Sequence, residues 1–104
     1  MTPPESEKLG VLTVTANATT GGQTVNVSPE AAAGNSLRYQ ITPSTSKPTV
    51  NYNTTCAVSD HWVNFTSGSN VTGATGNIIT VVEVDSLDKA VKKGEATLPA
   101  PTSE

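Results

Sequence analysis

The stretch TSGSNVTGATGNIITVVEVDSLDKAVKKGEAT, residues 66–97, decides the fold because a polar turn, an apolar strand, an acidic turn and a returning strand follow one another in it. Residues 78–84 are apolar on both faces of an extended chain, which predicts a strand at the centre of a sheet or beneath a subunit contact. Residues 85–89 favour a turn, and residues 90–98 return with Lys and Glu as solvent-facing charges. The segment therefore predicts a β-hairpin.

Three further segments show the period of two that is typical of strands with one buried face. Apolar residues alternate with polar ones over residues 12–16 and over residues 25–27, and residues 20–22 form a turn between them. This pattern predicts a second hairpin. Residues 37–41 alternate in the same way and predict a strand that ends at Pro43, because proline lacks the N–H that a central ladder needs.

The segment from residue 44 to residue 60 is the least regular part of the chain. Within it, Val50 and Tyr52 are expected to form a short edge strand. Trp62, the single tryptophan, follows this segment and is expected to fill the core between two sheets.

The pattern as a whole predicts an all-β fold, a sandwich of about 6–7 antiparallel strands. At 104 residues the chain has room for one hydrophobic core. Because hydrophobic residues make up 35% and aromatic residues 4% of the sequence, that core is expected to be thin. We expect an extended N-terminal arm over residues 1–9, the sandwich over residues 10–98 and an extended C-terminal tail over residues 99–104.

Composition weighs against several classes of function. With 6 basic and 9 acidic residues and a net charge of −3, the chain has no basic stripe for binding nucleic acid. No run approaches the ~20 apolar residues of a membrane span, and the N-terminus does not resemble a signal peptide. The single Cys56 cannot form an internal disulfide, which favours a cytosolic origin. Because the sequence starts at Met1, we expect a complete small gene product that works within an assembly.

Cys56, Asp60 and His61 are the first candidates for chemistry. A catalytic thiol needs a histidine and usually a third orienting group, and a metal site needs three or four ligands at short spacing. One Cys and one His in a Thr-rich loop fall short of both, so a structural role is expected.

Glu83, Asp85 and Asp88 are close enough in sequence to suggest a calcium loop. The Asp-x-Asp-x-Asp-Gly pattern of such loops is missing. Side-chain hydrogen bonds to the backbone of the turn explain the two aspartates more simply. No metal, cofactor or catalytic residue is therefore expected.

A glycan-binding site is the one candidate that the aromatic residues offer. Sugars stack on exposed rings, and Tyr52 is the best candidate for such a ring, with Trp62 as the second. The site requires both side chains to be accessible on one face.

Several short motifs, in their order and spacing, resemble a known family. They are LTVT (12–15), TVNVSP (24–29), GNSLRY (34–39), Trp62, TSG (66–68), TGATGN (72–77), VVEVD (81–85) and KAVKKG (89–94). Together they resemble a small Ig-like β-sandwich of phages of Gram-positive hosts, found in head-fibre and capsid-decoration proteins and in some surface proteins. The resemblance covers residues 10–98.

The resemblance implies a structural virion protein without enzymatic activity, made in the host cytoplasm, that decorates the outer surface of a capsid. Its partner would be the major capsid protein or another virion protein, and it would form a homo-oligomer such as a trimer. The arm is the expected anchor, adding backbone hydrogen bonds and avidity over the lattice. Its capsid-binding residues are Thr2, Pro3, Pro4, Glu5, Glu7, Lys8 and Leu9.

One hydrophobic surface between like subunits is expected at Ile79, Val81 and Val91, because the core needs only one side of their hairpin. The alternative function is a carbohydrate-binding adhesion module on a virion or cell surface. That module would use Tyr52 and Trp62 as its glycan contacts.

Overall fold

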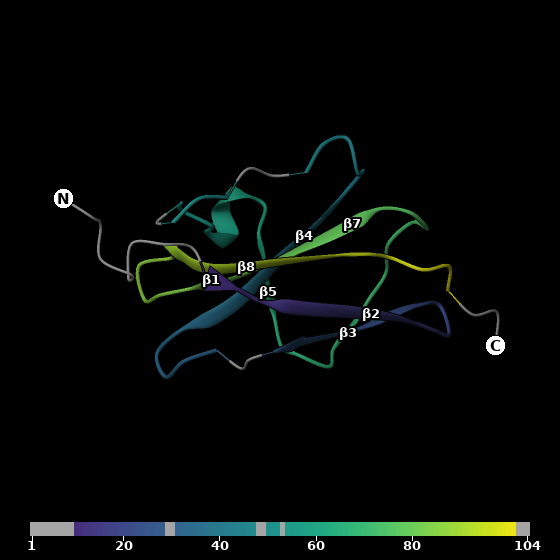
Figure 1. Ribbon diagram of the computed structural model, residues 1–104, viewed down its shortest axis with the longest axis horizontal. Coiled ribbons are helices and arrows are strands. Elements are labelled where there is room, and N and C mark those ends of the chain that lie inside the picture. The colour runs from purple at the N-terminus through teal and green to yellow at the C-terminus, as the bar shows by residue number, and fades with distance from the viewer. Residues whose placement is uncertain (1–9, 29–30, 48–49, 53, 102–104) are drawn as a thin grey trace.

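Two β-sheets packed face to face build the protein, which confirms the all-β sandwich prediction (Figure 1). The computed structural model describes residues 10–28, 31–47, 50–52 and 54–101. One sheet has the strand order β1-β8-β7-β4-β5 and the other the order β2-β3-β6. The strands are β1 (Gly10–Val11), β2 (Thr13–Thr19), β3 (Gly22–Ser28), β4 (Ser36–Thr42), β5 (Val63–Phe65), β6 (Asn70–Val71), β7 (Ile78–Val84) and β8 (Ala90–Thr97). The two sheets, with five and three strands, form a small Ig-like sandwich.

The predicted hairpin of residues 78–97 is confirmed and forms the centre of the larger sheet. β7 pairs antiparallel with β8 on one side and with β4 on the other. Every residue of β7 after Ile78 is buried. Its run of Val and Ile suits a strand covered on both faces, because branched side chains pack well on a pleated surface. The described part of the chain contains no helix that is long and apolar enough to cross a membrane.

The second predicted hairpin is confirmed as β2 and β3. Their pairing closes with Thr19 opposite Gly22, so Thr20 and Gly21 form a two-residue turn. Gly21 has a φ of 76°, a conformation that glycine adopts without steric cost. β6 pairs with the first part of β3, at Gln23 and Thr24, and completes the smaller sheet.

The main hydrophobic core lies between the two sheets. Its buried members are Leu12, Val25, Val27, Leu37, Phe65, Val71, Ile79, Val81 and Leu98. The rings of Tyr39 and Phe65 meet edge to face, with centroids 5.5 Å apart. The core consists mostly of aliphatic side chains, as the low aromatic content predicts.

A second hydrophobic cluster lies on the outer face of the larger sheet. It contains Val50, Cys56, Trp62, Val82, Val84 and Ala90. Successive side chains of β7 point to opposite faces, so Val82 and Val84 face away from the core that Ile79 and Val81 line. The connection between β4 and β5 contributes the covering residues Val50, Cys56 and Trp62.

Two sequence expectations for this connection are wrong. Trp62 does not fill the space between the sheets. It is buried in the outer cluster, where it covers the outer face of β7. Val50 and Tyr52 form no strand: Val50 is buried in the same cluster and Tyr52 lies in a turn. The physical reason is the apolar outer face of β7, which needs a cover that the smaller sheet cannot provide.

The sequence predicted antiparallel strands throughout, but one strand pair is parallel. β1 runs parallel to β8, with Gly10 and Val11 opposite Lys92 and Lys93. At Leu12 the chain then crosses to the other sheet, and the Leu12 N–H donates to the Lys93 carbonyl at 2.9 Å.

Gly94 permits this crossing. A Cβ atom at Gly94 would overlap the Leu12 carbonyl oxygen, and it would lie 2.7 Å from a methyl group of Val14. The close approach of two backbones therefore requires the missing side chain.

The described strands extend from Gly10 to Thr97, and Leu98 completes the core. The predicted arm of residues 1–9 lies outside the described residues. Of the predicted tail, residues 99–101 are described, and the Pro99 carbonyl accepts a hydrogen bond of 2.6 Å from Gln23 Nε2.

We expect Gly94→Ala to lower the free energy of unfolding by about 1–3 kcal/mol, because the new methyl group must displace the chain at Leu12. Urea denaturation followed by tryptophan fluorescence measures the change. Thr97→Ala, an exposed position on the same strand, serves as the control and should stay within about 0.5 kcal/mol of the wild type. Equal midpoints for the two variants would contradict the proposed overlap.

Candidate functional site

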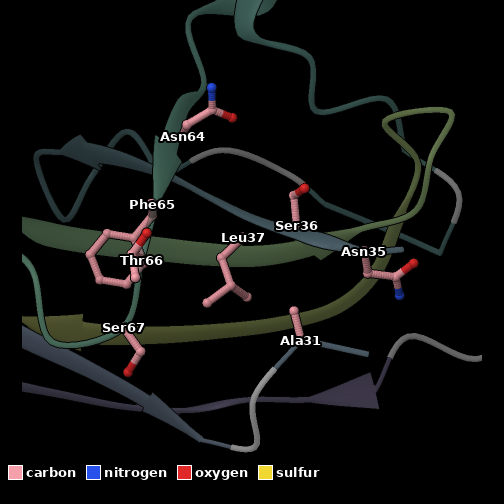
Figure 2. Close-up of a pocket in the computed structure, with 8 residues that line it drawn as sticks. All are labelled: Ala31, Asn35, Ser36, Leu37, Asn64, Phe65, Thr66 and Ser67. Atoms are coloured by element: carbon pink, nitrogen blue, oxygen red, sulfur yellow. The ribbon is translucent and has the colours of Figure 1, made fainter. Parts of the chain in front are cut away.

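A groove opens along one side of the sandwich, between β5 with the residues that follow it and the connection that precedes β4 (Figure 2). Its volume is about 590 Å³. Leu37 and Phe65, both buried, supply its apolar floor. Figure 2 shows Leu37 at the centre, with Phe65 and Ser67 to one side and Ala31 to the other. The remaining lining residues are Asn35, Ser36, Asn64 and Thr66.

Most polar side chains that could give this groove specificity already have partners in the fold. Asn35 Nδ2 donates to Glu83 Oε2 at 2.7 Å. Asn64 Oδ1 accepts from Arg38 Nε at 2.8 Å. Ser67 Oγ accepts from the Val27 N–H at 2.8 Å. Small-molecule sites combine an apolar lining with polar groups that converge on a ligand. This groove has the lining, but its polar groups hold the loops around it.

A second hollow of about 350 Å³, called the Glu83 hollow below, has Glu83 among its lining residues. Glu83 is 1% exposed, and its Oε2 accepts hydrogen bonds from the Ala32 N–H at 3.1 Å and from Asn35 Nδ2 at 2.7 Å. Lys92 Nζ lies 3.7 Å from Oε1, which accepts no hydrogen bond from the part of the chain that the structure describes. A buried charge is tolerated when it is paired and hydrogen-bonded, as it is here. Glu83 thus fixes the connection between β3 and β4 to the end of the central strand.

The calcium alternative fails on the positions of the three carboxylates. Asp85 Oδ1 accepts from the backbone N–H groups of Leu87 and Lys89, at 2.9 and 3.1 Å. Asp88 Oδ1 lies 2.9 Å from Arg38 Nη1, while Glu83 binds the other connection. Asp85 therefore stabilises its own turn, as predicted from the sequence. The same prediction for Asp88 is not met, because its carboxylate pairs with Arg38.

Cys56 and His61 do not form a reactive pair. Cys56 is fully buried in the outer cluster, and its Sγ lies 3.6 Å from the Thr54 carbonyl oxygen. His61 is exposed and ends a short 3-10 turn with a φ of 74°. Nowhere in the described ranges do three or more His, Cys, Asp or Glu side chains gather as metal ligands. Both residues lie in the connection between β4 and β5, where Cys56 packs in the outer cluster and His61 is at the surface.

Two of the three residues predicted to form a subunit interface lie inside the fold. Ile79 and Val81 are 0% exposed and belong to the core between the sheets, so the prediction is wrong for them. β7 is central and covered on both faces, and neither face is left for a second subunit. Val91 is half-buried beside the Glu83 hollow.

The predicted glycan platform is also not formed. Trp62 is 5% exposed and Tyr52 is half-buried, so they do not present two accessible rings on one face. Tyr52 lines the Glu83 hollow instead. The seven residues predicted to bind a capsid lie outside the described residues: Thr2, Pro3, Pro4, Glu5, Glu7, Lys8 and Leu9.

Sequence reasoning missed the hydrogen bonds of Arg38. Besides its contacts with Asn64 and Asp88, its Nη1 donates to the Cys56 carbonyl at 2.9 Å. Arg38 thereby ties β5, the covering connection and the β7–β8 turn to the outer face of β4. Its place between the inward residues Leu37 and Tyr39 shows that it faces outward, but the sequence does not identify its partners.

Burial and neighbouring charges shift the pKa of Glu95. Partial burial acts to raise the pKa of Glu95, but hydrogen bonds from Lys47 and Lys93 and the positive charges of both lysines outweigh it and lower the pKa below its ordinary value. The Nζ atoms lie 3.1 and 3.2 Å from the carboxylate oxygens.

We expect Glu83→Ala to lower the free energy of unfolding by about 2–4 kcal/mol, because it leaves the Ala32 N–H and the Asn35 amide without an acceptor and opens a cavity. Glu83→Gln keeps an oxygen and nearly the same volume, so it should cost less. Urea denaturation compares the two variants. If both cost the same, the hydrogen bonds are not what Glu83 contributes.

The lowered pKa of Glu95 predicts a stability contribution that is present above pH 4.5 and is lost as the pH falls below that value through the folded-state pKa. Glu95→Gln should therefore be less stable than the wild type at about pH 7, and the difference should disappear in acid. Urea denaturation at both ends of this range measures it. A difference that persists at about pH 2 would contradict the assignment.

Comparison with known proteins gives one informative likeness. No protein-family model and no curated protein matches the chain. The chain is similar to the solved structure of domains 4-9 of the surface layer protein SbsC, with 26% sequence identity and a TM-score of 0.67. The likeness covers 92% of this chain, which spans 15% of the length of that one.

Proposed function

We propose that this domain is a structural module of a protein layer on the outside of a cell or particle, and that it works by binding neighbours without catalysing a reaction. The similarity to domains of a surface layer protein carries the proposal, because it extends over almost the whole sandwich. The activity and partners of that longer protein do not follow from a likeness to 15% of its length.

The placement of the chain ends supports this proposal. Figure 1 shows the described chain entering towards one end of the long axis, at β1, and leaving at the opposite end after β8. A domain with its ends so placed can join others in a row without a long linker. Domains 4-9 of the similar protein are several units within one chain.

The chemistry of the described residues supports a binding role as well. The polar side chains of Glu83, Arg38 and Asp85 each fix a loop through hydrogen bonds to its backbone. Gln23 does the same through three hydrogen bonds to the backbone of Gly73 and Pro99. The groove over Leu37 and Phe65 has an apolar floor of the kind found in contacts between domains.

Decoration of a phage capsid is the narrower form of the same proposal. It rests on the family resemblance in sequence and adds a specific shell, a capsid protein as partner and an anchoring role for residues 1–9. A layer on a cell and a shell on a virion both repeat one contact many times, so weak contacts suffice through avidity.

Co-sedimentation distinguishes the two forms. The purified protein is mixed with cell-envelope fragments of the organism that encodes it, and separately with capsids that lack it. We expect saturable binding to one of the two, at a stoichiometry set by the lattice. Binding to envelope fragments alone would exclude capsid decoration, and binding to neither would refute the surface-layer proposal.

Deletion of residues 1–9 tests the anchoring role. The described strands begin at Gly10, so we expect the shortened protein to keep its unfolding midpoint. If these residues are the anchor, the protein loses binding in the same assay. Retained binding at the same stoichiometry would show that the contact lies on the sandwich itself.

A further inference from the structure

Among the described residues, none pairs with the backbone groups along the outer edge of β2. β2 is the end strand of the smaller sheet. Because Thr19 and Gly22 flank a two-residue turn, they exchange both of their hydrogen bonds, and every second pair along the ladder does the same. The N–H and C=O groups of Val14, Ala16 and Ala18 therefore point away from β3.

Hydrogen bonds on the far side of β3 agree with this assignment. Ala16 lies opposite Val25, whose N–H donates to the Ser69 carbonyl at 3.0 Å and whose carbonyl accepts from the Gly68 N–H at 2.7 Å. Val25 thus turns both backbone groups away from β2, and so Ala16 cannot be bonded to it. Gly68 and Ser69 thus bond to the side of β3 that faces away from β2. No described residue pairs with the outer edge of β2.

None of the features that protect a strand edge occurs along β2. Its sequence, TVTANAT, contains no charged residue and no proline, and its pairing with β3 runs without a bulge. The other edge strands of the described sheets are short: β1 and β6 have two residues and β5 has three. Short strands, charges, prolines and bulges are the usual protections against edge-to-edge association. β2 has seven residues and no such protection.

We propose that β2 pairs antiparallel with β2 of a second copy about a two-fold axis, which joins the two three-stranded sheets into one. With Ala16 opposite its own counterpart, Val14 lies opposite Ala18 of the second copy and all outward backbone groups are bonded. A two-fold contact brings the same patch together from both copies. The patch is small and uncharged, so two copies meet without repulsion. This pairing does not depend on the proposed surface layer, because it is measured in free solution.

Cross-strand charges test the pairing and its register. Thr15 and Asn17 are exposed on the outer face, and each lies opposite the other across the proposed axis. Thr15→Lys with Asn17→Lys sets like charges opposite each other twice and should weaken the dimer at least about tenfold. Thr15→Lys with Asn17→Glu sets opposite charges there and should restore the wild-type dimer. Both double variants should unfold at the same urea concentration.

Sedimentation equilibrium over a concentration series measures the dimer, and hydrogen exchange locates it. The amides of Val14, Ala16 and Ala18 should exchange more slowly as the protein concentration rises. A wild-type protein that stays monomeric to roughly 1 mM would overturn the proposal. So would a dimer that the double-lysine variant leaves unchanged, or amide exchange at these residues that does not depend on concentration.

Discussion

Burial of β7 on both faces is the constraint on which the rest of the structure depends. One face is covered by the smaller sheet and the other by the connection between β4 and β5. A strand of branched aliphatic residues cannot leave either face in water without losing about 25 cal/mol for each Å² of apolar surface. The two hydrophobic clusters, the position of Trp62 and the hydrogen bonds of Arg38 all follow from that requirement. Glu83, the one charged residue of the strand, is tolerated because two donors and a lysine meet it.

The hairpins could be predicted from the sequence because the residues that indicate each strand and turn are close together in the chain. Alternation in residues 12–16 and 25–27, the Thr20-Gly21 turn and the apolar run of residues 78–84 each indicate a strand or a turn within a few residues. The covering connection could not be predicted, because nothing local distinguishes a residue that packs on its own sheet from one that folds back over a distant strand. The sequence therefore predicts the wrong side of β7 for Trp62. It also does not predict the parallel pairing of β1 with β8, because a strand of two residues shows no periodicity.

The candidate site was less predictable than the fold. The prediction of a surface at Ile79 and Val81 assumes that a hairpin needs only one covered side, whereas β7 lies in the middle of its sheet and is covered on both faces. The turn role of Asp85 could be predicted, because an aspartate at the start of a tight turn bonds to its own backbone. The hydrogen-bond partners of Glu83 and Arg38 lie 18 to 51 positions away in the sequence. Only the fold brings such residues together.

The parallel pairing of β1 with β8 has a mechanical consequence. If the domain is held in a row by its two ends, tension enters the described chain at β1 and leaves it after β8. These strands are neighbours that point the same way, so a pull on opposite ends slides one along the other. The hydrogen bonds between them, with that from Leu12 to Lys93, then carry the load side by side and must break together. A hairpin pulled open from its free ends would lose its bonds one at a time. Under such a load the short first strand would resist extension, because its hydrogen bonds to β8 lie across the direction of the pull.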